Sequence, residues 1–361
     1  MHEKKCRPVQ ERWDKSDMPS RTVLFAFLIS TIVWITGCQI PFLAERPSRI
    51  HLVIDAGSSG TRFCPYRVDN YCAHVDPAQA CLRITARSGL ADLNGAEIQK
   101  VLDQGVQELE GMEIEKAVLL GTGGFRRLSE SRRTKQLELI ADELKKRIPN
   151  SESRVITGQQ EANLAYIAMI AFRDGKTDHI ILETGGATVQ LAGSGLTARS
   201  APAGLNEIRN SPDLPRECTE EADASSERFE ACSKGLRQIF RSNRWHAAFF
   251  KDQDLASVYA LGSSWQSIFT VAGKESLSLD ELQNQGKRIC NSSLDEIVKA
   301  GVPEKFAPAS CYLHSYQYVL ASELKIGTLL QGEGSWPPGA AISQYFEGCR
   351  FSAEGNGSAT Q

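Results

Sequence analysis

The sequence predicts an α/β protein with two related lobes, each built from a mixed sheet flanked by helices. First, short apolar strands alternate along the chain with stretches whose apolar residues have helical spacing. Second, HLVIDAGSSGTRF at 51–63 has a counterpart in HIILETGGATVQL at 179–191. Both run from a strand through an acid and a glycine turn to an apolar return. Third, 361 residues are enough for two domains of ordinary size.

The other elements continue the alternation. In chain order, we expect a helix over 96–112, a strand and glycine turn over 116–128, a helix over 134–148, a strand over 153–158, a helix over 159–172, a strand, turn and helix over 256–269, a helix over 311–324, and a turn with a last helix over 335–346. Thr157 and Gln160 have the spacing of a capping box, which places a helix start just before Glu161. The polar segment 216–232 is predicted to be a surface excursion closed by its own cysteines.

The N-terminal region predicts export. Residues 22–38, TVLFAFLISTIVWITGC, form an uncharged apolar run that is short for a membrane-spanning helix but suits a signal peptide. Its last four residues resemble a bacterial lipobox, so we expect translation to start at Met18 and Cys38 to become the lipidated, membrane-attached N-terminus. A retained membrane anchor and an ordinary cleaved signal are the alternatives. All three predict a protein of the cell envelope or periplasm.

The composition limits the partners. An apolar fraction of 41% and a charged fraction of 24% are those of a soluble globular body. The formal charge of −3 gives no electrostatic case for nucleic acid as a partner.

The cysteines predict disulfides. Ten cysteines less Cys6 and Cys38 leave eight, an even number, in an exported chain: Cys64, Cys72, Cys81, Cys218, Cys232, Cys290, Cys311 and Cys349. Eight cysteines allow 105 connectivities, and no CxxC spacing points to a metal site. Local pairing favours Cys72–Cys81, Cys218–Cys232 and Cys290–Cys311, which leaves Cys64 for Cys349.

The two repeated turns carry groups that bind phosphate. Glycines such as Gly185 allow close backbone approach, and consecutive N–H groups form a concavity for anions. Side-chain donors are expected from Ser58, Ser59, Thr61, Thr188, Arg62 and Arg126. Asp55 and Glu183 stand just before the turns and would repel phosphate directly. Their expected role is to hold a divalent cation, through water, that bridges phosphate oxygens.

Glu161 is the candidate general base. The first turn of a helix favours a carboxylate, so a purely structural role is the alternative. Beside a phosphate clamp, this carboxylate can orient and deprotonate an attacking water, and Gln190 can hold the same water from the opposite lobe. Trp336 and the turn at 260–265 are candidates for contact with a nucleobase, with a place in the core as the alternative.

These motifs, in this order, resemble the conserved regions of the apyrases, the nucleoside triphosphate diphosphohydrolases. They are DAGSSGTR at 55–62, TGGFR at 122–126, ITGQQE at 156–161 and ETGGATVQ at 183–190. CYLHSYQYVL at 311–320 and SWPPGAAI at 335–342 resemble two later regions. One departure is Glu183, where that family usually has aspartate.

The resemblance implies two lobes of the actin and ribonuclease H type with the active site in the cleft between them. It also implies Ca²⁺- or Mg²⁺-dependent release of terminal phosphate from nucleoside tri- and diphosphates such as ATP and ADP. By position, Glu161 would activate the water, Gln190 would hold it, and Asp55 and Glu183 would orient the waters of the metal. The residues implied to bind phosphate are Ser58, Ser59, Gly60, Thr61, Thr122, Gly186, Ala187 and Thr188. The expected division is 1–48 for the signal, lipoprotein or anchor segment, 49–165 for lobe I, 166–330 for lobe II, and 331–361 for a C-terminal return to lobe I.

Two other functions fit parts of the sequence. An exopolyphosphatase or guanosine pentaphosphate phosphatase has a similar TGxxE and DxGG pattern, and APAGLNEIR at 201–209 resembles a segment of that group. An inactive nucleotide-binding lipoprotein is the third possibility, although the presence of Glu161 argues against it.

Overall fold

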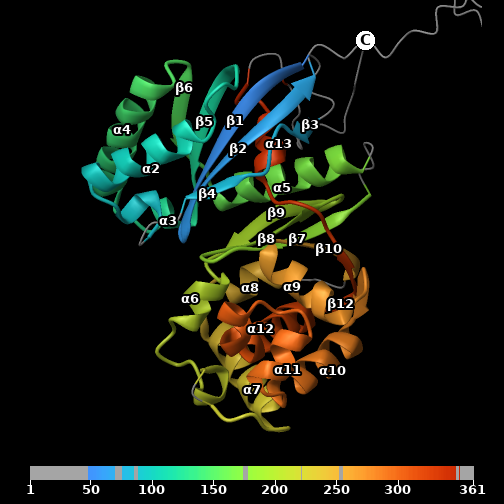
Figure 1. Cartoon of the computed structure of the whole chain (residues 1–361). Coiled ribbons are helices and arrows are strands. Elements are labelled where there is room, and N and C mark those ends of the chain that lie inside the picture. Colours follow the sequence, from blue (N-terminus) through green and yellow to red (C-terminus); the bar gives the residue numbers. More distant parts are fainter. Residues whose placement is uncertain are drawn as a thin grey trace, which may run out of the picture. The chain divides into compact units, whose positions relative to one another are not determined.

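The computed structural model describes residues 48–69, 75–84, 88–173, 178–220, 222–251, 255–346 and 349. They belong to one compact unit that begins at Pro47. In this unit two mixed sheets are flanked by helices (Figure 1), which confirms the predicted two-lobe α/β class. No helix within these ranges is long and apolar enough to cross a membrane. The run 22–38, with Met18 and Cys38, lies outside the described residues.

The first sheet is organised around β1. It has the order β3-β2-β1-β5-β6, with β4 also paired to β2. β1 forms an antiparallel hairpin with β2 and a parallel pair with β5. The strands are β1 (Ser48–Gly57), β2 (Gly60–Asp69), β3 (Val75–Pro77), β4 (Leu82–Ile84), β5 (Ile114–Gly121) and β6 (Ser151–Val155).

The second sheet repeats this plan around β7. Its order is β11-β12-β10-β7-β8-β9, and β7 likewise has one antiparallel hairpin partner, β8, and one parallel neighbour, β10. The strands are β7 (Ile180–Thr184), β8 (Val189–Gly193), β9 (Leu196–Ala201), β10 (Leu255–Leu261), β11 (Ser276–Ser278) and β12 (Ile326–Gln331). Asp55 pairs across its hairpin with Arg62, and Glu183 pairs with Gln190. The repeat in the sequence is therefore a repeat in structure.

Helices cover both sheets. They are α2 (Gly95–Gln107), α3 (Gly123–Arg126), α4 (Glu130–Arg147), α5 (Gly158–Phe172), α6 (Leu205–Arg209), α7 (Arg228–Ser242), α8 (His246–Phe249), α9 (Ser263–Ala272), α10 (Leu279–Cys290), α11 (Leu294–Lys299), α12 (Ser310–Glu323) and α13 (Pro337–Ala341), with 3₁₀ turns η1 (Leu90–Asp92), η2 (Arg216–Cys218) and η3 (Glu304–Ala309). The expected capping box is present, because the side chains of Thr157 and Gln160 each accept the other's backbone N–H. It starts α5 at Gly158 and leaves Glu161 in the first turn.

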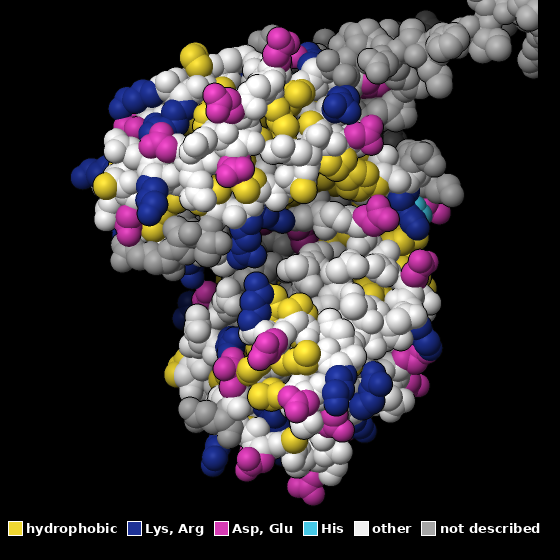
Figure 2. Space-filling view, in the orientation of Figure 1, with side chains coloured by type: hydrophobic (Ala, Val, Ile, Leu, Met, Phe, Trp, Pro, Cys, Tyr) yellow, Lys and Arg dark blue, Asp and Glu magenta, His cyan; other side chains and the backbone are white. Residues whose placement is uncertain are grey.

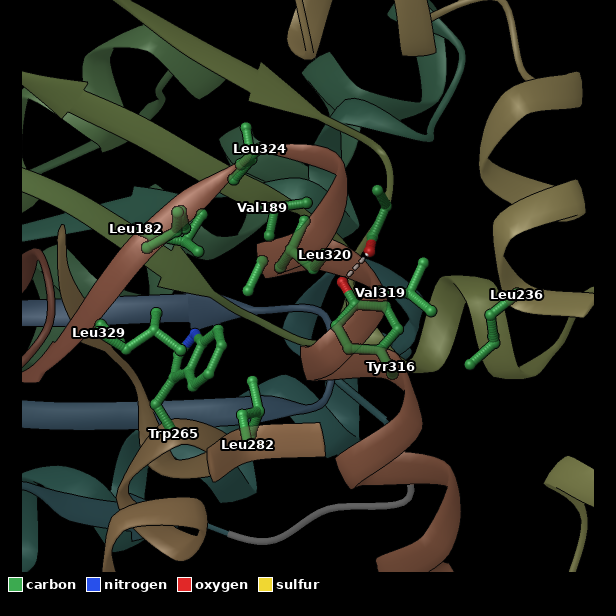
Figure 3. Packing of buried hydrophobic residues seen from close by; sticks show 14 of the residues in the cluster. Leu182, Val189, Leu236, Trp265, Leu282, Tyr316, Val319, Leu320, Leu324 and Leu329 are labelled. Atoms are coloured by element: carbon green, nitrogen blue, oxygen red, sulfur yellow. Dashed lines mark hydrogen bonds between the residues drawn. The ribbon is translucent and has the colours of Figure 1, made fainter. Parts of the chain in front are cut away.

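The core of the second sheet holds the end of β7 and the segment after β9 (Figure 3). Trp265 is fully buried and donates its indole N–H to Oγ1 of Thr184, the last residue of β7, at 2.9 Å. The hydroxyl of buried Tyr316 donates to the carbonyl of Ala203, just before α6. Because buried polar groups need partners, these two bonds fix where the large aromatic side chains lie.

α13 packs tightly on α5 and on β1. A Cβ atom at Gly339 would lie 1.9 Å from the carbonyl oxygen of Leu164, so only glycine fits at this crossing. Trp336 and Phe346, which flank α13, share an apolar cluster with Val53 of β1. The end of the described chain therefore completes packing that begins near residue 50.

The disulfides are partly as expected. Cys218–Cys232 and Cys290–Cys311 are confirmed. Cys72–Cys81 and Cys64–Cys349 are wrong, because Cys64 pairs with Cys81. The reason is that β4 pairs with β2 in a register that sets Phe63 opposite Leu82, and this register carries Cys81 to Cys64. Cys349 is also disulfide-bonded, while Cys72 lies outside the described residues.

Two local expectations need correction. The segment 216–232 is not wholly a surface excursion: its second part begins α7, where Phe229 is buried, and both of its cysteines are buried in cores. The glycine turn expected after β5 is the short helix α3, whose four residues include both glycines of the TGGFR motif.

Candidate active site

The first hairpin turn lies against both the second hairpin turn and α3. A Cβ atom at Gly186 would be 3.4 Å from Oγ of Ser58, and one at Gly124 would be 3.1 Å from Cα of Ser58. Between them is a cavity of about 330 Å³, which we call the front cavity. Figure 2 shows the hollow between the two lobes, with arginine or lysine and acidic side chains at its edges.

Most of the predicted site residues line the front cavity: Asp55, Ser58, Ser59, Gly60, Arg62, Thr122, Glu161, Glu183, Gly185, Gly186, Ala187, Thr188 and Gln190. Two do not. Thr61 is buried within β2, and Arg126 lies behind the cavity against Glu161. The structure thus brings together residues from β1, β7, α3 and α5 that are far apart in the sequence.

The segment after β9 braces the second turn. Leu205 and Asn206 donate their backbone N–H groups to the carbonyls of Gly185 and Gly186, at 3.0 and 2.8 Å. A Cβ atom at Gly204 would lie 2.4 Å from backbone atoms of the turn, so a side chain there would displace it. These contacts involve residues 201–209, the segment that resembles the exopolyphosphatase group.

Asp55 is held by Arg62 across the β1–β2 hairpin. Arg62 donates from Nε at 2.8 Å and from Nη2 at 2.6 Å, both to Oδ2 of Asp55. The guanidinium that was expected on phosphate therefore orients Asp55, although it also lines the cavity. Oδ1 of Asp55 is buried and has no hydrogen-bond partner among the described residues.

Glu183 has the equivalent position in the second hairpin, but its hydrogen-bond partner comes from outside that hairpin. Its Oε1 accepts a hydrogen bond from the hydroxyl of Ser335, while Oε2 is buried without a partner in the described part of the chain. Burial raises the pKa of Glu183 to about 8, and the nearby carboxylate of Glu161 adds to the increase.

These two carboxylates fit a hydrated divalent cation. No group of three or more His, Cys, Asp or Glu side chains in the described ranges could form a metal site by itself. Asp55 and Glu183 nevertheless each present one unsatisfied carboxylate oxygen to the same cavity. Mg²⁺ commonly keeps several waters and binds through one or two carboxylates together with substrate phosphates. Asp55 and Glu183 are therefore the residues that would hold such an ion.

We expect Mg²⁺ or Ca²⁺ to stabilise the protein most at alkaline pH. The folded-state pKa values of Glu161 and Glu183, about 7 and about 8, lie above the ordinary 4.5. The folded chain then binds more protons than the unfolded chain, so the free energy of unfolding falls as pH rises from 4.5 through 8. An ion at a hundred times its Kd would restore about 2.7 kcal/mol.

Thermal melts from pH 5 to 9, with and without the ion, measure this effect. Glu183→Gln should flatten the pH dependence and lose most of the ion-induced shift. Glu333→Gln, which removes an exposed acid outside the front cavity, is the matched control. Equal ion-induced shifts in the two variants would contradict the assignment.

Glu161 forms a hydrogen-bonded ion pair with Arg126. Nη2 of Arg126 donates to Oε2 of Glu161 at 2.9 Å, and Nη1 donates to the carbonyl of Ile156 at 3.0 Å. Burial raises the pKa of Glu161 to about 7; the charge and hydrogen bond of Arg126, and a hydrogen bond from Gln190, limit the increase. A base with a pKa near the working pH is well matched to proton transfer.

Thr188 connects the base to the second turn. Its Oγ1 accepts from Nε2 of Gln190 at 2.6 Å and from Nη2 of Arg126 at 3.4 Å. Gln190 is thus oriented toward the cavity between Thr188 and Glu161. This is the neighbourhood in which an attacking water would be held.

Sequence reasoning missed Ser335 and Arg83. Ser335 binds Glu183 directly, and its only signal was its place as the first residue of the SWPPGAAI run at 335–342. Arg83 reaches the front cavity because β4 pairs with β2, and its Nη2 donates to the carbonyl of Ser59 at 3.4 Å. Trp336 lines the cavity edge but is only 2% exposed, so it belongs mainly to the core.

The comparisons with known proteins identify the fold. No protein-family model matches the chain, and no curated protein sequence matches it. The Ppx/GppA family member of Aquifex aeolicus matches with a TM-score of 0.58 at 14% identity, over 81% of this chain and 96% of that chain. An exopolyphosphatase from Cytophaga hutchinsonii gives 0.52 at 15%, over 81% and 96%. Nucleoside triphosphate hydrolases from Neospora caninum give 0.53 at 12%, over 90% and 96%. The chain has the two-lobed fold of these proteins.

Proposed function

We propose that this protein hydrolyses phosphoric anhydride bonds and releases the terminal phosphate from a chain of phosphates. The observation that carries the proposal is Glu161: a buried carboxylate with a pKa near 7, oriented by Arg126 and Gln190, beside two glycine turns. A pKa of about 7 leaves this carboxyl partly ionised near neutral pH. It suits a group that must gain and lose a proton.

Each residue has one task in the reaction. Backbone N–H groups of the two turns, with the hydroxyls of Ser58 and Thr122, bind the terminal phosphate. Gln190 orients a water in line with the bridging oxygen, and Glu161 accepts its proton as the P–O bond from water forms and the bridging bond breaks. A divalent cation held by Asp55 and Glu183 would neutralise charge on the phosphate oxygens.

We favour polyphosphate or a guanosine-pentaphosphate-like nucleotide as the substrate. The Ppx/GppA and exopolyphosphatase structures support this choice, as does the bracing of the second turn by residues 201–209. The aromatic side chains of the front cavity, Tyr66 and Trp336, are 4% and 2% exposed. They therefore offer little surface for stacking on a nucleobase.

Nucleoside tri- and diphosphates, the substrates of apyrases, are the second candidate. The DAGSSGTR motif and the match to the Neospora caninum hydrolases over 90% of this chain favour them. That likeness is at 12% identity and the Ppx/GppA likeness is at 14%, so both support the fold more directly than the substrate. Our preference rests mainly on residues 201–209 and on the buried aromatic side chains of the front cavity.

A substrate panel separates the candidates. Phosphate release is measured with Mg²⁺ or Ca²⁺ on polyphosphate, guanosine pentaphosphate, ATP, ADP, GTP and UDP. We expect the highest kcat/KM on polyphosphate or guanosine pentaphosphate. Preference for ATP and ADP would establish the second candidate. No release from any of them, at any metal concentration, would reject the hydrolase in favour of a binding protein.

We also propose that the protein is exported. Three disulfides among the described residues fit an oxidising compartment. The lipid on Cys38 and the membrane attachment rest on the sequence alone. Fractionation of expressing cells, with Cys38→Ser as the comparison, tests both: a cytosolic full-length chain would contradict export.

A further inference from the structure

A second cavity lies behind the catalytic residues. It has a volume of about 550 Å³ and lies between the start of α5, β9 and α8. We call it the rear cavity. Three residues, Gly123, Ala187 and Thr188, line both this cavity and the front one.

The wall between the two cavities is thin. A Cβ atom at Gly123 would lie 2.8 Å from Cβ of Ala187 and 3.4 Å from Cγ2 of Thr188, so the wall is a contact between very small side chains. Glu161 lines the front cavity only, and Arg126, which holds its carboxylate, lines the rear cavity only. Glu161, the proposed base, therefore lies at the boundary between the two cavities.

The rear cavity is suited to an anion. Arg126, Arg127 and Arg199 line it, and Glu207 is the one acidic residue among its described lining. Oε2 of Glu207 lies 3.6 Å from Nη1 of Arg127, and both side chains are substantially exposed. Arg199 donates to two backbone carbonyls, those of Phe249 and Lys251, at 3.3 and 3.0 Å. Arg126 is paired with Glu161 and Arg127 lies beside Glu207, whereas the partners of Arg199 are neutral carbonyls, so the rear cavity has an excess of one positive charge.

The geometry of the displacement reaction suggests a role for the rear cavity. In an in-line displacement, water attacks from the side opposite the leaving oxygen. Because Glu161 receives the water's proton, the shortened phosphate chain leaves on the other side, toward Arg62 and Arg83 of the front cavity. The released orthophosphate is then enclosed between that chain and the wall.

We propose that the rear cavity is the binding and exit site for orthophosphate. This inference rests on the proposed hydrolase function. Phosphate passes between α3 and the β7–β8 turn, where Gly123 meets Ala187, and is received by the arginines. The shortened substrate stays in the front cavity during this step.

One experiment follows cleavage and release separately. Ala248 is exposed on α8 and lines the rear cavity, whereas its neighbour Ala247 is also exposed but does not line it. Single-turnover reactions of Ala248→Phe and Ala247→Phe are read by acid quench for bond cleavage and by a phosphate-binding sensor for free phosphate. Ala248→Phe should cleave at the wild-type rate and release phosphate about tenfold more slowly. Release that keeps pace with cleavage in Ala248→Phe would overturn the exit.

A second measurement does not depend on activity. Calorimetric binding of inorganic phosphate is compared in wild type, Arg127→Gln and Arg132→Gln; Arg132 is an exposed arginine that lies outside the rear cavity. Arg127→Gln should weaken binding about tenfold, the loss expected for one charged hydrogen bond, and Arg132→Gln should leave it unchanged.

The outcomes separate the two proposals. A wild-type protein that binds inorganic phosphate with the expected dependence on Arg127 but cleaves no substrate would reject the hydrolase and keep an anion site. Normal cleavage with no phosphate binding, or with equal binding in the two arginine variants, would reject the rear cavity alone.

Discussion

Glu161→Gln should lose nearly all hydrolysis while leaving substrate binding almost unchanged. Glutamine keeps an oxygen for the hydrogen bond from Arg126 but cannot accept the proton of the attacking water. Loss of a positioned general base lowers kcat by about 10²–10⁴-fold. The measurement is kcat and KM on the best substrate of the panel, with the melting temperature as a check of folding.

The pH profile gives the same residue a second test. Because burial raises the pKa of Glu161 to about 7, the carboxyl is protonated and inactive below that pH. In wild type, kcat/KM should rise with pH through about 7 and then level off, and this rise should be absent from the residual activity of Glu161→Gln. A variant that kept more than a tenth of the wild-type kcat, with the rise intact, would show that another group is the base.

Gly339→Ala should be the most damaging small substitution outside the cavities. The added methyl group would lie 1.9 Å from the carbonyl oxygen of Leu164, inside van der Waals contact with the backbone of α5. Overpacking of this kind destabilises by about 3 kcal/mol. α13 would have to move away from α5, and with it Ser335, which binds Glu183.

The expected result is a lower midpoint of denaturant unfolding together with a loss of activity. Gly95→Ala is the matched control, since Gly95 begins α2 and an added Cβ atom would lie 3.8 Å from its nearest neighbour, Leu139. It should be neutral or slightly stabilising. If Gly339→Ala proved as stable as Gly95→Ala, α13 and α5 could separate without loss of stability, and the prediction would be wrong.

What the sequence predicted well was local in the chain. The capping box at Thr157, the two repeated turns and the acids before them each depend on residues within a few positions of one another. The similarity of the two turns also predicted that they meet at one cavity, because they are the equivalent strand ends of two related lobes. The clamp residues therefore come together largely as expected.

What the sequence missed depends on how distant segments pack. Arg62 and Arg126 have the charge of phosphate ligands, but each is bound to a carboxylate, and only the cross-strand register and the position of α5 show this. Cys81 finds Cys64 through strand pairing rather than nearness in sequence. The rear cavity combines residues from 123 to 249 that share no motif, so no pattern could have revealed it.

The apolar cluster shared by Val53, Trp336 and Phe346 has a consequence for biogenesis. Contacts between residues so far apart in sequence are slow to form, and a growing chain cannot make them before residue 346 has been synthesised. Part of the apolar surface around Val53 therefore stays uncovered until Trp336 and Phe346 have been synthesised. If the chain is exported, as we propose, this delay keeps it unfolded while it crosses the membrane.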